Sequence, residues 1–191
     1  MAEVDRVGSP EWLMQVAADQ LAKNTDIQYH EQRQELSCRR PNSGLYAIEY
    51  LIRKNTLIVT GDVGCAIYQW CDSITFDFVA GCHLHYFEEK CVASEAGRDF
   101  IEWDPRVAQY RLTRLKDSDE LCSSLASEIL QSGAFNEVES VNEFVHSVNG
   151  DADLSGEELA MLCNIGYRVH LRCAMHLHGV QRCRNLGAFS T

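Results

Sequence analysis

The stretch Leu57-Ile-Val-Thr-Gly-Asp-Val-Gly-Cys-Ala-Ile-Tyr-Gln-Trp70 has the pattern of a β-hairpin. Its apolar runs, Leu57–Thr60 and Cys65–Trp70, flank Gly61-Asp-Val-Gly64, and glycine tolerates the positive φ angles of a tight reversal. Upstream, Tyr46–Ile52 alternates apolar and polar residues, which is the period of a half-buried strand. The stretch therefore predicts an antiparallel meander with an apolar face, which helices from the rest of the chain must cover.

The 191 residues are expected to form a single α+β domain, in which three to four strands pack against several helices, including a long C-terminal helix. The predicted parts are an N-terminal helix at 9–23, strands over about 28–70, a helical part over about 75–178 and a tail at 179–191. Apolar periodicity predicts helices over Thr75–Cys91 and Glu157–His178. The polar segment Gln28–Cys38 is predicted as an edge strand.

Composition indicates a globular protein, with 46% hydrophobic and 24% charged residues. No apolar run approaches the roughly 20 residues that cross a bilayer, and the N-terminus lacks the basic and apolar regions of a signal peptide. We therefore expect a cytoplasmic chain whose nine cysteines are free thiols.

The net charge of −11 comes from one part of the chain, the acidic stretch Asp117–Glu158. This stretch holds eleven acidic residues and no Lys or Arg, whereas the remainder holds seventeen of each sign. Such a surface repels nucleic acid and attracts a basic groove of another protein, although solubility alone would also explain it. The residues that we expect to bind a basic partner are Asp117, Asp119, Glu120, Glu137, Glu139, Glu143, Asp151 and Asp153.

Two clusters of Cys and His carry the side chains that zinc prefers. One is Cys82-His-Leu-His85 with Cys91, and the other is Cys173–His178 with Cys183. Neither cluster has the closely spaced cysteine pair of a zinc knuckle, and reduced cysteines also serve as small core hydrophobes. We predict neither a metal nor a cofactor.

The segment Asp151–Leu162 begins like a calcium-binding loop, but Leu162 stands where such a loop needs a bidentate Glu. The run Ser155-Gly-Glu-Glu158 instead predicts a capping box at a helix start.

No segment carries the signature of a catalytic site, and we assign no catalytic residue. Asp62 fits a turn, and no Cys–His pair is singled out by its surroundings. The carboxylates Glu95, Asp99, Glu102 and Asp104 are candidates for acid–base work, but a solvated face is the better explanation because acid–base work also needs burial. The basic residues form no stripe with aromatic residues, so we expect no direct binding of nucleic acid.

The turn Arg39-Arg-Pro-Asn-Ser43 and the hairpin Leu57–Tyr68 resemble a group of phage and prophage proteins with an Ile-Thr-Gly-Asp-Met-Gly hairpin. Leu162-Cys-Asn-Ile-Gly-Tyr167 is similar to the final helix of that group, whereas Arg53-Lys-Asn55 departs from its Trp-Pro-Gly-type turn. The group has no assigned activity, so the resemblance transfers no catalytic residue. It implies a phage origin, and small acidic phage proteins often inhibit bacterial defence systems, including CRISPR effectors.

We therefore expect a non-enzymatic, anti-CRISPR-like phage inhibitor that acts in the host bacterial cytosol. Its acidic surface would bind the basic nucleic-acid groove of a host defence protein or CRISPR effector complex, without contacting a membrane. Two alternatives remain. One is a small metal-dependent or thiol enzyme acting on a nucleotide or on the defence machinery, with Asp62 and the two Cys/His clusters as candidates; the other is a phage assembly or accessory protein.

Overall fold

The computed structural model describes residues 9–95, 101–117, 123–152 and 155–189, and it has the predicted α+β fold. Its internal contacts divide the chain into two compact units. The sheet unit consists of Pro10–Phe100 and Val169–Thr191. The helical unit contains Ile101–Arg168.

The sheet unit contains an antiparallel sheet of six strands among the described residues, in the order β1-β2-β3-β4-β5-β6. The strands are β1 Asp26–His30, β2 Glu35–Arg39, β3 Ile48–Arg53, β4 Thr56–Gly61, β5 Ala66–Gln69 and β6 Cys91–Ser94. The expectation of three to four strands was too low. The segment Gln28–Cys38 forms parts of two strands, because a short 3-10 turn (η2, Glu31–Arg33) and Gln34 in the left-handed region reverse the chain.

The predicted hairpin is confirmed as β4 and β5. Ile58 of β4 pairs with Ile67 of β5, and the connecting turn contains Gly61 at φ 123° and Gly64 at φ 93°. In β3, Ile48, Tyr50 and Ile52 are buried while Glu49 is exposed, as the alternating pattern predicted.

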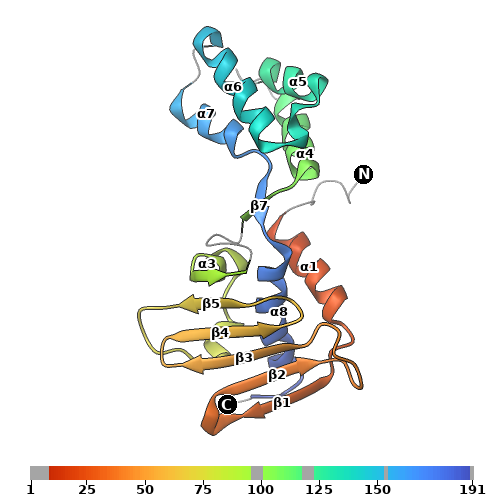
Figure 1. Ribbon diagram of the computed structural model, residues 1–191, viewed down its shortest axis with the longest axis vertical. Helices are drawn as coiled ribbons and strands as arrows, with labels where there is room; N and C mark the ends of the chain where they lie inside the picture. The colour runs from red at the N-terminus through yellow and green to blue at the C-terminus, as the bar shows by residue number, and fades with distance from the viewer. Residues whose placement is uncertain (1–8, 96–100, 118–122, 153–154, 190–191) are drawn as a thin grey trace. The chain divides into compact units, whose positions relative to one another are not determined.

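Four helices pack on one face of this sheet. They are α1 Pro10–Leu21, α2 Phe76–Ala80, α3 Leu84–Glu88 and α8 Leu171–Asn185. Their buried side chains, among them Leu13, Phe87 and Leu177, form one core with the inward side chains of the strands. No helix of residues 10–95 and 169–189 covers the opposite face, which is turned toward the viewer in Figure 1. We call this surface the open face.

The predicted helix over Thr75–Cys91 was wrong, because this segment forms α2, α3 and the start of β6. Thr75 caps α2 through the backbone N–H of Phe78, and Gly81 ends the helix. The apolar residues of both helices point into the same core, which is why the sequence pattern looked continuous.

The helical unit consists of α4 Pro105–Lys116, α5 Ser123–Ser132, η3 Ala134–Asn136, α6 Val138–Ala152 and α7 Gly156–Cys163, with strands β7 Ile101–Trp103 and β8 Tyr167–Val169 at its ends. Buried side chains such as Leu112, Ile129 and Val145 form a second core. The predicted capping box of Ser155 and Glu158 begins α7, so the start of the calcium-like segment has a structural explanation.

The predicted helix over Glu157–His178 was also wrong. α7 ends at Cys163, β8 follows, and α8 begins only at Leu171. Between α7 and β8, a Cβ atom at Gly166 would lie 2.7 Å from the indole ring of Trp103, so the chain needs glycine where it passes this ring. The predicted tail at 179–191 is largely helical, since α8 continues to Asn185 and buries Val180 and Cys183.

Candidate functional site

The turn between β4 and β5 presents Asp62 and Cys65 to solvent. The pKa of the Cys65 thiol is raised, mainly by its hydrogen bond to the Glu95 carboxyl group. A nucleophilic cysteine needs a lowered pKa instead. The geometry therefore gives no support to Cys65 as a catalytic thiol.

The first Cys/His cluster is split between the core and the surface. Cys82 is buried, its S–H donates to the carbonyl of Phe78 over 3.5 Å, and burial raises its pKa. His83 and His85 are exposed, and His85 lies 3.5 Å from Glu89. In the part of the chain that the structure describes, no three His, Cys, Asp or Glu side chains gather in a way that could hold a metal ion.

The second cluster contributes to the core of the sheet unit. His176 is fully buried; its Nε2–H donates to the carbonyl of Val63 over 3.3 Å, and its Nδ1 accepts from the Tyr68 hydroxyl over 2.9 Å. Burial lowers the pKa of His176 to about 4, so the ring is neutral near pH 7. Burial also raises the pKa of Cys173. His176 therefore links the β4–β5 turn to α8.

Cys183, the remaining member of this cluster, is buried beside Cys38 of β2. The hydrogen bond between the two thiols raises the pKa of Cys183 and lowers that of Cys38. Both side chains are fully buried, so they pack as core residues.

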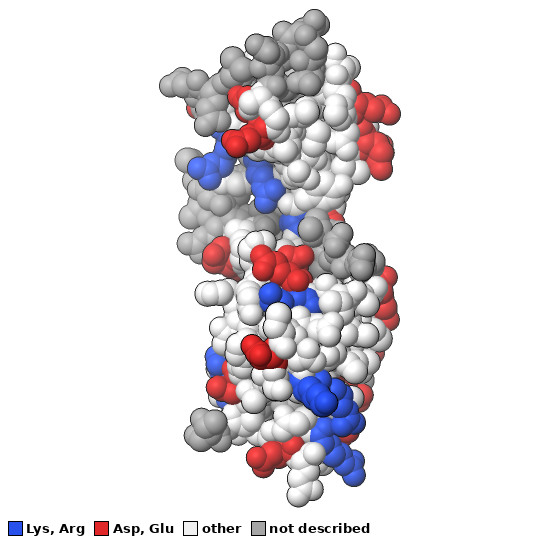
Figure 2. Space-filling model, turned by 90° about the vertical axis from the view of Figure 1, so that its left-hand side faces the viewer, with Lys and Arg blue, Asp and Glu red and all other residues white. Residues whose placement is uncertain are grey.

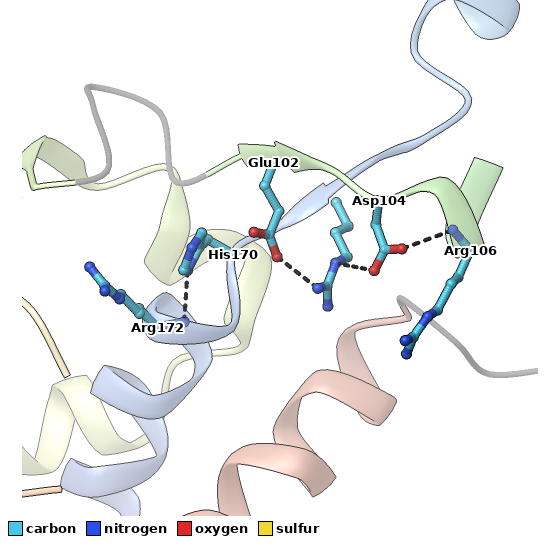
Figure 3. A network of polar contacts seen from close by, with 6 residues as sticks. Glu102, Asp104, Arg106, His170 and Arg172 are labelled. Atoms are coloured by element: carbon cyan, nitrogen blue, oxygen red, sulfur yellow. Dashed lines mark hydrogen bonds and ion pairs between the residues drawn. The ribbon is translucent and has the colours of Figure 1, made fainter. Parts of the chain in front are cut away.

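Three of the four candidate acid–base carboxylates are engaged in ion pairs. Glu102 and Asp104 point toward the same guanidinium (Figure 3), which belongs to Arg168 at distances of 2.7 and 2.9 Å. Asp104 also accepts from the backbone N–H of Arg106 and so caps α4. Glu95 lies 3.6 Å from Arg172, and Asp99 lies outside the described residues. These contacts tie strands and helix ends together.

The acidic stretch lies on the helices of the helical unit. Asp117 caps the end of α4, Glu137 precedes α6, and Glu139 and Glu143 share one face of α6, four residues apart. Asp151 is also in α6, but its side chain lies outside the described part of the structure. Asp119, Glu120 and Asp153 lie wholly outside it.

The carboxylates of this stretch that the structure describes are exposed, apart from the half-buried Glu158 of the capping box. Within the described residues, no ion pair involves Asp117, Glu128, Glu137, Glu139, Glu143 or Glu157. In Figure 2, the red group at the upper right edge is bordered by white side chains rather than by Lys or Arg.

Two arginines of the helical unit are used internally. Arg168 is only 14% exposed and binds Glu102 and Asp104. Arg111 donates to the carbonyls of Ile165 and Tyr167 over 3.1 and 3.0 Å. These two positive charges are thereby engaged within the unit, and the exposed carboxylates of the acidic stretch have no ion pair among the described residues.

Sequence reasoning missed the role of Arg168, which it assigned to the last helix. The alternation of Tyr167-Arg-Val169, with an aromatic and a β-branched residue, is the signal of a short strand that could have revealed it.

Comparison of the chain with protein-family models, with curated protein sequences and with solved structures finds no match. Among the described residues, no helix combines the length and apolar character that crossing a membrane requires.

Proposed function

We propose that this chain is a non-enzymatic inhibitor that binds a basic groove of another protein through the acidic surface of its helical unit. The observation that carries the proposal is the exposure of Glu137, Glu139 and Glu143 without an ion pair among the described residues. Carboxylates in this state are free to meet lysine and arginine side chains that otherwise bind phosphates.

The charge of the unit supports this binding mode. Residues 101–168 hold thirteen acidic and five basic side chains, and the half-buried Arg168 is already occupied by Glu102 and Asp104. Like charges on one surface cost self-repulsion in the folded state. A partner of opposite charge removes this cost, so the repulsion itself favours association.

The kind of target follows from the resemblance of the Leu57–Tyr68 hairpin to phage and prophage proteins. On that basis, we take the target to be a nucleic-acid-binding complex of bacterial defence, such as a CRISPR effector. Binding would then block the groove that holds the nucleic acid, and inhibition would need no catalytic residue.

The test compares two variants of equal net charge. One reverses Glu137, Glu139 and Glu143 to Lys on the helical unit, and the other reverses the exposed Glu31, Asp62 and Asp72 to Lys on the sheet unit. Each tagged protein is incubated with lysate of a bacterium that carries a CRISPR system, washed at low and then high salt, and the bound effector is assayed for binding of a labelled guide and target.

We expect wild type and the sheet-unit variant to capture the effector and to displace its nucleic acid at low salt only. The helical-unit variant should lose capture. Equal loss with both variants would mean that total charge alone is responsible. Unchanged capture by the helical-unit variant would overturn the proposed surface.

A further inference from the structure

A row of apolar side chains crosses the open face of the sheet. The strand register places Leu51 of β3 beside Ile58 of β4, Ile58 beside Ile67 of β5, and Ile67 beside Ala93 of β6. Ile67 is 37% exposed, and Leu51 and Ile58 are half-buried. The solvated face of an antiparallel sheet normally carries polar side chains. We call these four residues the apolar row.

Opposite charges flank the apolar row at equal distances. Side chains two residues apart in a strand share a face, so Glu49, Leu51 and Arg53 all point to the open side of β3. Glu49 and Arg53 are exposed, and neither side chain has an ion pair among the described residues. On β4, the neutral Thr60 and Thr56 flank Ile58 in the same way.

This arrangement is complementary to itself. A second copy that is turned about a two-fold axis along the apolar row places its own row on the first. The same rotation exchanges the two sides of the row, so Glu49 of each copy faces Arg53 of the other. Two equivalent opposite-charge contacts thus surround a set of apolar contacts, which is the form of an isologous interface.

At the β2 end of the row, this packing brings two like charges together. Glu35 of β2 lies in register with Leu51, so the rotation brings the Glu35 carboxylates of the two copies together. Arg33 lies 3.9 Å from Glu35 in its own copy and offsets this repulsion. Glu35 is also two strands away from Ile58, where the twist of two packed sheets separates their surfaces.

We propose that the chain forms a symmetric dimer in which the open faces of two sheets pack against each other along the apolar row. Strands about 4.8 Å apart give the face a width of roughly 25 Å, and its length is roughly 15–20 Å. The contact is therefore smaller than the roughly 800 Å² per partner of a standard interface, and we expect a dimer that dissociates on dilution.

The test is the oligomeric state of the full chain, measured by sedimentation velocity from roughly 1 µM to roughly 1 mM. Wild type should shift from monomer to dimer within this range. Ile58→Lys, and independently Ile67→Lys, should stay monomeric throughout, because each buries a charge in the centre of the contact. Far-ultraviolet circular dichroism verifies that both variants are folded, and the exposed Asp72→Lys is the matched control.

Charge exchange tests the orientation of the two copies. Glu49→Arg or Arg53→Glu alone should weaken the dimer about tenfold or more, because each places like charges together at both symmetric contacts. The double variant, Glu49→Arg with Arg53→Glu, should restore association because it only exchanges the two charges. If either residue only stabilised its own copy, the double variant would not regain association.

Three outcomes overturn the proposal: a monomer at every concentration, a dimer that persists in both the Ile58→Lys and Ile67→Lys variants, or a double variant as weak as the single ones. None of these bears on the acidic surface, which lies in the other unit. The dimer and the proposed inhibitory function can therefore fail independently.

Discussion

The two units of this chain carry the same number of acidic residues but differ in how those charges are balanced. Residues 10–100 and 169–191 hold thirteen acidic and eleven basic side chains, whereas residues 101–168 hold thirteen and five. The sheet unit is nearly neutral, and its open face carries an apolar row. The helical unit keeps its exposed carboxylates without counter-ions among the described residues. The uncompensated negative charge therefore lies on the helical unit, and the apolar row lies on the sheet unit.

The units also differ in what holds them together. In the sheet unit, contacts join distant segments, such as the Tyr50 hydroxyl and the carbonyl of His176 at 2.9 Å. In the helical unit, helices that follow one another in sequence share a core, and Arg168 ties the two ends of the segment. We therefore expect a substitution in one core to destabilise only the unit that contains that core. Hydrogen exchange of the whole chain, read out on peptides from each unit, measures this effect.

The largest effect is expected at Gly179 of α8. A Cβ atom at this position would collide with the buried hydroxyl of Tyr50. We expect Gly179→Ala to lower the opening free energy of sheet-unit amides by about 3 kcal/mol, with little change in the helical unit. Gly156→Ala is the control, because a Cβ atom there meets nothing within 4 Å. Equal loss of protection in both units would contradict the division.

The next effect is expected at Arg168 of β8. Removal of its side chain leaves Glu102 and Asp104 without their shared partner. We expect Arg168→Ala to lower the opening free energy of helical-unit amides by about 2–3 kcal/mol. Arg106→Ala should change it little, because the exposed Arg106 side chain points away from this network in Figure 3. A similar loss in both variants would show that the ion pairs are not responsible.

Acid should act first on the sheet unit. The pKa of His176 is lowered to about 4 in the folded state, below the usual value of 6.5, so the unfolded state binds the proton more readily. The stabilisation is full above pH 6.5 and is lost as the pH falls toward 4. We expect a loss of about 2 kcal/mol between pH 7 and pH 5, measured by urea unfolding of the sheet unit. His176→Gln should lack most of this loss, with a remainder from His178, whose pKa burial also lowers, and the exposed His146→Gln should retain it in full. A wild-type pH dependence in His176→Gln would assign the loss to other groups.

The smallest effect is expected at α6, and it has the opposite sign. Glu139 and Glu143 lie four residues apart on one helix face, where like charges repel. Glu143→Lys should stabilise the helical unit by about 0.5 kcal/mol at low salt, with the gain reduced at high salt. Glu143→Gln should give a smaller gain. A destabilised Glu143→Lys would mean that this carboxylate serves the fold, which would weaken the case for a binding role.

Features of the fold that depend on neighbouring residues, such as strand alternation and tight turns, were predictable from the sequence. Alternation identified the buried side of β3, and glycine marked the β4–β5 turn. The reversal between β1 and β2 was missed, because Gln34 adopts the left-handed region with no glycine or proline around it. The break after α7 was missed because the apolar spacing continues through it, and the close approach of Trp103 to Gly166 joins residues far apart in the sequence.

The candidate site was predictable in its charge but not in its partners. Counting residues located the acidic stretch, and the capping box of Ser155 and Glu158 followed from local spacing. Counting could not reveal that Arg168 and Arg111 are engaged within the unit, because their partners depend on the tertiary fold. The Cys/His clusters looked like ligand sets in sequence, but burial separates Cys82 from the exposed His83 and His85, and His176 is hydrogen-bonded to Val63 and Tyr68 in the core.

The discontinuous course of the sheet unit has a consequence for synthesis on the ribosome. Residues 26–94 supply the strands, yet α8 at Leu171–Asn185 supplies much of the core that covers them. The apolar side of the sheet therefore stays incompletely covered while the 76 residues between β6 and α8 are made, at about 5–20 residues per second. The segment Ile101–Arg168 emerges before α8 as a continuous piece with its own core, so the helical unit should fold before the sheet unit is complete. During those seconds the nascent chain exposes the apolar surfaces that chaperones bind.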